Sequence, residues 1–318
     1  MKTISAAVIG AGAMGSNHCR IYSAMDNVEL VGVSDIDKRL SENISQKHKC
    51  RSFTNFDSLL SEIKPDVVSI ATPTQSHTEV ALSCIEAGAA VMVEKPIADT
   101  VDNAQKIIDA AGESDKKYDA IALCLGLCGN STVGLKSPGI QLVIPRAHDC
   151  CTLFLGSKGK FKEHFGERPS SSFNSAGYLE HGGDYIHEAE TIIKKTGLDE
   201  EYADLVKQYG EDNAKFIWET LHSHQDAAER DNKLFYIEVP EFEHLGYAEK
   251  CAKQALTENK EFVKLEGNIR LIKKLVYGEW DDEEFLIVRD GEETAGVYDL
   301  DIIINKKRIE PHKAHKKT

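Results

Sequence analysis

The chain has 318 residues, enough for two domains and a sizeable core, and its composition of 41% hydrophobic and 28% charged residues is ordinary for a globular protein. No apolar run approaches the ~18–20 residues of a membrane span, the N-terminus lacks a signal-peptide core, and a net charge of −14 argues against nucleic-acid or anionic-membrane binding. We therefore expect a cytoplasmic protein with a small-molecule substrate and without nucleic-acid or membrane partners, with homo-oligomerisation left open.

An apolar run that ends in glycines opens the chain, since residues 4–15 read ISAAVIGAGAMG. The apolar part predicts a parallel strand that is buried on both faces. The glycines follow the G-x-G-x-x-G pattern, in which the first allows a tight turn, the second lets the backbone approach a pyrophosphate and the third lets helix and strand pack closely. A helix that starts there directs free N–H groups at the phosphates. The predicted phosphate-binding residues are Gly10, Gly12, Ala13, Met14 and Gly15.

A second predicted strand, residues 28–33, leads to Asp35, about 20 residues past the glycines. A carboxylate at that distance accepts hydrogen bonds from an adenosine ribose and repels the 2′-phosphate of NADP. We therefore expect NAD as the cofactor, although the nearby Lys38 and Arg39 leave NADP open. The alternative role of Asp35 is to cap the N-terminus of a helix.

Strands and helices alternate through the rest of the first third of the chain. Predicted helices at 57–63, 77–87 and 101–111 alternate with predicted strands at 66–71 and 90–93. This alternation predicts an α/β fold with a doubly wound parallel sheet, whose ligands bind at the carboxyl ends of the strands. The glycine turn, Asp35, Thr72-Pro73 and Glu94-Lys95-Pro96 all follow predicted strands.

These motifs resemble one known family. GAGAMG (10–15), Asp35, ATPTQSH (71–77) and EKPIA (94–98) are similar to the nucleotide-binding half of the Gfo/Idh/MocA oxidoreductases, over residues 1 to about 112. The resemblance implies a Rossmann domain and hydride transfer between a nicotinamide and a sugar or polyol carbon. The residues that it places around the nicotinamide end are Thr72, Pro73, His77, Glu94 and Pro96.

Lys95 is the catalytic residue that the same resemblance implies, beside the reacting hydroxyl, and Lys95-Pro96 is implied to be a cis peptide. A lysine beside an alcohol can assist removal of the hydroxyl proton while the hydride leaves. The alternative role of Lys95 is a structural ion pair with Glu94 or another carboxylate.

The polar segment 113–117 predicts a domain boundary. We expect a Rossmann domain over residues 1–115, a second α/β domain with several helices over 116–305, and a frayed basic tail over 306–318. In the oxidoreductase family the second domain supplies a D-x-G-x-H pattern to the substrate pocket. The nearest candidates here are Asp184 and His187, which are three residues apart with no glycine between them.

Cysteines gather after two further predicted strands, residues 118–125 and 141–144. Thiolates with a histidine suit zinc, iron–sulfur or other soft metal centres. A helix starting at Cys150 would also lower thiol pKa values and allow thiol chemistry, and plain packing is the third alternative. The residues at these two strand ends are Cys124, Cys128, Asn130, Arg146, His148, Asp149, Cys150 and Cys151.

Residues from about 118 to 305 resemble the uncharacterised family called domain of unknown function 1638, on GLCGN (126–130), PRAHDC (145–150), SAGYLEHG (175–182) and the segment 194–223. The resemblance implies Cys128, His148 and Cys150 as metal ligands and an association with corrinoid-dependent methyl transfer. Members begin with their own α/β segment, which the nucleotide-binding half replaces here, so a metal site would lack a ligand.

The remaining predicted elements alternate again. The helices are 185–195, 199–209, 212–230, 243–256 and 268–277, and the strands are 234–239, 261–265 and 284–288. We expect an NAD(P)-dependent oxidoreductase acting on a sugar- or polyol-like alcohol. The alternatives are a metal- or corrinoid-associated protein that binds a dinucleotide for sensing or structure, and a catalytically incompetent join of two domains.

Overall fold

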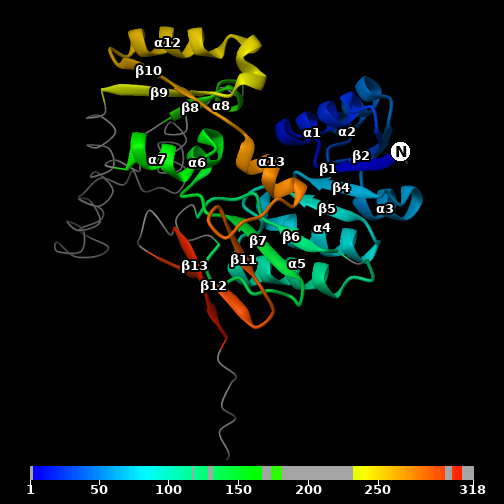
Figure 1. The fold of residues 1–318 in the computed structure, drawn as a ribbon. Coiled ribbons are helices and arrows are strands. Elements are labelled where there is room, and N and C mark those ends of the chain that lie inside the picture. Colours follow the sequence, from blue (N-terminus) through cyan, green and yellow to red (C-terminus); the bar gives the residue numbers. More distant parts are fainter. Residues whose placement is uncertain are drawn as a thin grey trace, which may run out of the picture. The chain divides into compact units, whose positions relative to one another are not determined.

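The computed structural model describes residues 3–116, 118–127, 132–166, 173–180, 232–297 and 303–309 (Figure 1). The described residues form two compact units. The first contains the chain up to Pro145 together with the C-terminal strands from Phe285 onward, and the second contains the chain from Arg146 to Glu284.

A five-stranded parallel sheet forms the centre of the first unit, in the order β3-β2-β1-β4-β5. Its strands are β1 (Ile4–Ile9), β2 (Val28–Ser34), β3 (Arg51–Phe53), β4 (Val67–Ile70) and β5 (Ala90–Val93). The helices between and after them are α1 (Ala13–Ala24), α2 (Lys38–His48), α3 (Phe56–Ile63), α4 (Thr74–Glu86) and α5 (Val101–Glu113). The predicted doubly wound sheet is confirmed.

Helices cover both faces of this sheet because side chains alternate along its strands. Val8 of β1 packs with Cys19 of α1 and Ile44 of α2 in one cluster. The neighbouring residues Ala7 and Ile9 belong to a second cluster, which contains buried side chains of α3, α4 and α5. The apolar run of β1 is therefore buried on both sides, as its sequence predicts.

Helix α2 and strand β3 were not predicted from the sequence. The α2 segment, KRLSENISQKH, buries only Ser41 and Ile44, so it has a weak apolar pattern. Its N-cap is Asp37, whose Oδ1 accepts a hydrogen bond from the backbone N–H of Arg39 at 2.9 Å. The alternative role considered for Asp35, a helix N-cap, is thus wrong, because Asp37 fills it.

Two further small sheets complete the first unit. Strands β6 (Ala120–Ala122), β7 (Gln141–Pro145) and β11 (Phe285–Val288) form one sheet in the order β11-β7-β6. In the other, β12 (Glu292–Gly296) pairs with β13 (Ile304–Arg308). The compact unit thus continues past the predicted boundary at residue 115. Lys306, at the start of the predicted tail, lies in β13, where its Nζ pairs with Glu292 at 2.8 Å.

A three-stranded parallel sheet, β10-β9-β8, organises the second unit. Its strands are β8 (Phe173–Ser175), β9 (Lys233–Glu238) and β10 (Glu261–Glu266), and its helices are α6 (Cys150–Leu155), α7 (Lys158–Phe165), α8 (Ala176–Glu180), η1 (Pro240–Leu245), α12 (Tyr247–Thr257) and α13 (Arg270–Tyr277). The predicted helix 243–256 is divided at Gly246, whose φ of +68° ends η1. The predicted elements between 185 and 230, with Asp184 and His187, lie outside the described residues.

No helix in the described part of the chain is long and apolar enough to cross a membrane.

Candidate functional site

The strand register brings the predicted site residues to one edge of the five-stranded sheet. Ile9 at the end of β1 pairs with Ser34 of β2 and with Ile70 of β4, and Ile70 pairs with Val93 of β5. The residues that follow these strand ends therefore emerge side by side at the carboxyl edge, where open α/β sheets bind their ligands.

In the turn after β1, two of the three glycines have no room for a side chain and one does. A Cβ on Gly10, whose φ is +96°, would lie 2.5 Å from the carbonyl oxygen of Ala71, and a Cβ on Gly15 would lie 1.7 Å from that of Gly10. A Cβ on Gly12 would meet nothing within 4 Å. The first and third glycines are thus required by the fold, whereas the second leaves free space at the surface of the turn.

Helix α1 begins at Ala13 without a side chain to cap it. Gly12 occupies the N-cap position and has no side-chain hydrogen bond to offer, so the first N–H groups of this twelve-residue helix lack a side-chain acceptor. Such groups, together with the positive end of the helix dipole, favour an anionic group in front of the helix.

Asp35 holds the glycine turn against the end of β2. Its Oδ2 accepts a hydrogen bond from the backbone N–H of Ala11 at 2.7 Å, and its Oδ1 accepts one from the N–H of Asp37 at 2.8 Å. A carboxylate has about four lone-pair positions, so two remain for a ligand hydroxyl. The predicted neighbourhood of Asp35 and the glycines is present in the structure.

The turn after β4 contains a buried hydroxyl without a partner. Thr72 Oγ1 is inaccessible to solvent and has no hydrogen-bond partner among the described residues. Buried polar atoms in native proteins nearly always have a partner, so Thr72 Oγ1 is an unsatisfied group in this turn.

His77 is buried between the turn after β4 and the turn after β5. Its ring is 1% exposed, and its two nitrogens lie 2.9 Å from the carbonyl oxygens of Thr72 and Pro96. The ring thus ties the turn after β4, including Pro73, to the turn after β5. His77 therefore fixes the backbone of these two turns, and its place at the nicotinamide end stays a prediction.

Glu94 and Lys95 follow β5, and the Lys95-Pro96 peptide is cis, as predicted. Glu94 Oε1 lies 2.7 Å from His18 Nε2 on α1. Its Oε2 accepts a hydrogen bond from the backbone N–H of Lys95. The hydrogen bond to His18, helped by the Lys95 N–H, lowers the pKa of Glu94 although burial opposes this. Glu94 is therefore a carboxylate held in place by its neighbours.

Lys95 itself is exposed, and none of the ion pairs among the described residues includes its Nζ. Glu94 forms its ion pair with His18, and the alternative role of Lys95 in an ion pair with Glu94 or another carboxylate stays a prediction. The sequence contains no local signal for the pair of His18 with Glu94, since 76 positions separate its two members.

A dinucleotide fits this edge on the observations above. Gly12 leaves free space at the start of α1, whose N-cap has no side-chain hydrogen bond, and Asp35 retains acceptor capacity. These groups match, in order, a pyrophosphate and a ribose.

The cysteine region is built differently. In the second unit Asp149 caps α6 by accepting a hydrogen bond from the N–H of Thr152. His148 stacks on Phe161, with ring centroids 4.9 Å apart. Cys150 Sγ lies 3.2 Å from Tyr178 Oη. Cys128 lies outside the described residues. Within the described ranges no group of three or more His, Cys, Asp or Glu side chains could hold a metal ion, so the metal prediction stays a prediction.

The prediction of lowered thiol pKa values at α6 is wrong for Cys151. Burial raises the pKa of this thiol, and the charges of Asp149 and Cys150 act in the same direction. The side chain is 1% exposed and packs in the core of the second unit, so desolvation outweighs the dipole of a six-residue helix.

Two family models match the chain, and their matches overlap. The model of the Gfo/Idh/MocA group, described as "Oxidoreductase family, NAD-binding Rossmann fold", matches residues 4–120. The model described as "Protein of unknown function (DUF1638)" matches residues 99–276, more than half of the chain. Both resemblances predicted from the motifs are confirmed.

Several individual relatives match about a third of the chain. An inositol 2-dehydrogenase from Rubrobacter xylanophilus is 30% identical over 117 residues, 36% of this chain and 34% of the relative. A UDP-N-acetylglucosamine 3-dehydrogenase from Acidithiobacillus ferrooxidans is 36% identical over 106 residues, 33% of each chain. The solved structure of the Acidithiobacillus enzyme aligns over 36% of each chain with 34% identity and a TM-score of 0.33. The chain thus spans about a third of the length of the curated relatives it matches.

Proposed function

We propose that this chain, which belongs to the family described as protein of unknown function (DUF1638), binds NAD at the carboxyl edge of its five-stranded sheet and oxidises an alcohol or reduces the corresponding carbonyl compound. The single observation that carries the proposal is the convergence of the glycine turn, Asp35, Thr72 and Lys95 at that edge.

Three features of the chain would hold the cofactor. The N–H groups at the start of α1 and the space at Gly12 receive the pyrophosphate, and Asp35 accepts the ribose hydroxyls. Thr72, in the turn after β4, lies at the same edge of the sheet, beside these groups. Asp35 also favours NAD over NADP, because its carboxylate repels a 2′-phosphate.

Lys95 is the catalytic residue of the proposal. Bound NAD supplies the hydride acceptor. In its neutral form the Lys95 amine accepts a hydrogen bond from the substrate hydroxyl and takes its proton during oxidation, and the resulting ammonium returns that proton to the carbonyl oxygen during reduction. Glu94, fixed by His18, orients the turn that carries Lys95.

The names of the relatives concern hydroxyl groups of inositol and sugars, but those enzymes share only about a third of their length with this chain. Sugar- or polyol-like alcohols are therefore the first substrates to screen.

Cofactor binding is tested by titrating the full chain with NAD, NADH, NADP and NADPH. We expect NAD(H) to bind more tightly than NADP(H), and Gly12→Ala to weaken NAD binding at least tenfold without changing the free energy of unfolding, since the new Cβ meets only the ligand. Gly177→Ala on α8 is the matched control, because a Cβ there also meets nothing within 4 Å. Equal NAD affinity in the Gly12 and Gly177 variants would contradict the site.

Catalysis is tested with Lys95→Ala. We expect hydride transfer, followed by NADH absorbance, to fall about 100-fold or more with NAD affinity retained, which is the usual contribution of a general base. Lys253→Ala, an exposed lysine of α12, should leave the rate unchanged. Hydride transfer that survives Lys95→Ala would remove Lys95 from the chemistry.

A further inference from the structure

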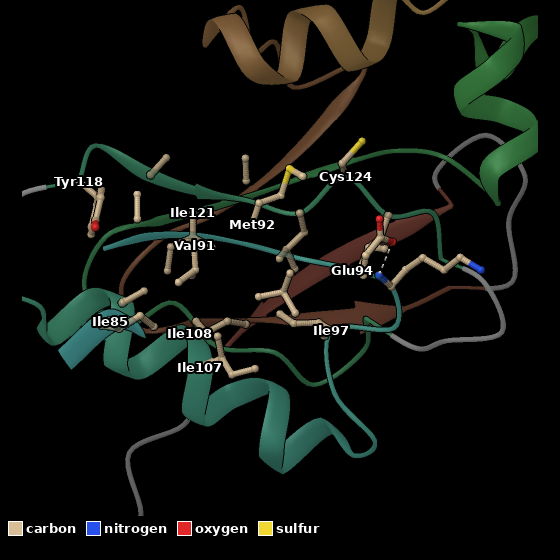
Figure 2. Close-up of a pocket in the computed structure, with 18 of the residues that line it drawn as sticks. Ile85, Val91, Met92, Glu94, Ile97, Ile107, Ile108, Tyr118, Ile121 and Cys124 are labelled. Carbon is tan, nitrogen blue, oxygen red and sulfur yellow. Dashed lines mark hydrogen bonds between the residues drawn. The ribbon is translucent and has the colours of Figure 1, made fainter. Parts of the chain in front are cut away.

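A cavity of about 530 Å³ lies within the first unit, between β5, β6 and helix α5 (Figure 2). Its walls are hydrocarbon, for example Val91 on β5, Ile121 on β6 and Ile108 on α5. At this volume it falls within the range of about 300–1,000 Å³ that is usual for small-molecule sites.

The cavity exists because two sheet edges face it. β5 is the last strand of the five-stranded sheet and β6 is the last strand of the β11-β7-β6 sheet, and no ladder of hydrogen bonds joins β5 to β6. Ala90 and Glu94 direct their N–H groups to Asp66 and Ile70 on the β4 side. The opposite edge of β5 is therefore open toward the cavity.

The two ends of the cavity differ in chemistry. Tyr118 lies at one end and Glu94 at the other, and Lys95 follows Glu94 in the lining (Figure 2). The carboxylate of Glu94 already interacts with His18 and with the N–H of Lys95. Lys95, the second charged residue at this end, is exposed, and no ion pair among the described residues includes its Nζ.

We propose that this cavity binds the hydrocarbon portion of an alcohol or carbonyl ligand whose polar group lies beside Lys95. The inference rests on the proposed function for one point only, namely that this ligand is the substrate. A sugar in the same space would leave hydroxyl groups without partners against Ile97, Ile107 and Ile108, which costs free energy, whereas a hydrocarbon chain is stabilised there. The cavity follows β5 from Ala90 to Lys95, a run of about 16 Å at about 3.3 Å per residue, which suits an unbranched chain.

The test is calorimetric titration of the full chain, without cofactor, with straight-chain primary alcohols from butanol to decanol and with myo-inositol. We expect Kd to fall about fourfold per added methylene, which corresponds to ~0.8 kcal/mol, until the chain fills the cavity. An affinity that does not depend on chain length, or inositol binding as tight as that of octanol, would overturn the inference.

Two variants narrow the cavity from opposite walls. Ile121→Trp on β6 and Ala111→Phe on α5 should each reduce octanol affinity at least tenfold, and the second stands in if the first fails to fold. The matched control is Ile21→Trp, which enlarges a half-exposed side chain on α1 that does not line the cavity. Octanol affinity that stays unchanged in a folded Ile121 or Ala111 variant would contradict the assignment.

The two proposals can fail separately. If octanol binds with the expected chain-length dependence but is not oxidised with either cofactor, the cavity inference stands and the proposed oxidoreductase function fails. If NAD-dependent oxidation occurs equally well for short polyols and for long-chain alcohols, the proposed function stands and the cavity inference is overturned.

Discussion

The carboxyl edge of the five-stranded sheet in the first unit and the His148–Cys150 turn of the second unit both follow strands, and both carry residues suited to binding. At the carboxyl edge, the strand register aligns four turns, and the first N–H groups of α1 have no side-chain cap. At the other turn, the same kinds of side chain serve the local fold, since Asp149 caps α6 and His148 stacks on Phe161.

The difference lies in what each site requires. The carboxyl edge of the five-stranded sheet consists mainly of backbone groups, whose positions are determined by parallel strand pairing and by the glycines of the turn after β1. A metal site at the His148–Cys150 turn would require several side chains to converge within about 2–2.5 Å of one point, and proximity in sequence does not ensure this. The predictions below test this contrast in order of decreasing effect.

Gly15→Ala should have the largest effect on stability. Its Cβ would lie 1.7 Å from the carbonyl oxygen of Gly10, so the backbone of α1 or of the turn must move. We expect a loss of about 3 kcal/mol or more, because the clash is with backbone and no side chain can give way. Chemical denaturation measures it, with Gly12→Ala as the comparison, and similar stabilities of the two variants would show that the tight contact is not maintained.

His18→Ala should cost about 1.5–3 kcal/mol at neutral pH, because it removes a hydrogen bond to the half-buried carboxylate of Glu94. The pKa of Glu94 is lowered in the folded state, so its contribution is present above the unfolded pKa and is lost as pH falls through the folded pKa. The variant should therefore lose less stability than the wild type on acidification. Unfolding measured across this acidic range would contradict the pairing if both proteins showed the same slope.

Asp149→Ala should destabilise by about 1 kcal/mol, the usual cost of losing an N-cap, and Asp149→Asn should be nearly neutral because asparagine caps equally well. Thermal unfolding of the two variants separates a capping role from a charge role. If Asp149→Asn were as damaging as Asp149→Ala, the carboxylate would have a function at this turn beyond capping α6.

The smallest expected effect concerns the buried thiols. Burial raises the pKa values of Cys19 and Cys84 to about 12 each and raises that of Cys151. A thiol at neutral pH is then almost entirely protonated and inert. Iodoacetamide labelling of the native protein, read by mass spectrometry, should leave these three cysteines unmodified and should modify them after denaturation. Rapid labelling of Cys151 in the native state would restore thiol chemistry at α6.

Particular residues show how far the sequence could be interpreted. The buried strands β1, β2, β4 and β5 were predicted within one or two residues, because largely apolar runs bounded by glycine, proline or aspartate have few alternatives. Helix α2 was missed because its segment, KRLSENISQKH, is strongly polar and contains only two large apolar residues, Leu40 and Ile44. The observed strand β6, Ala120–Ala122, is shorter than the predicted strand 118–125, because only these three residues pair with β7.

By itself, the sequence determined the doubly wound sheet, the glycine turn and the positions of Asp35, Thr72 and Lys95 at strand ends, since these follow from local periodicity and backbone conformation. Only the tertiary structure decided that His18 holds Glu94, that His77 joins two turns, and that an apolar cavity lies along the open edge of β5. Each of these depends on groups far apart in the chain. Their proximity results from how sheets and helices pack, which no short stretch of sequence encodes.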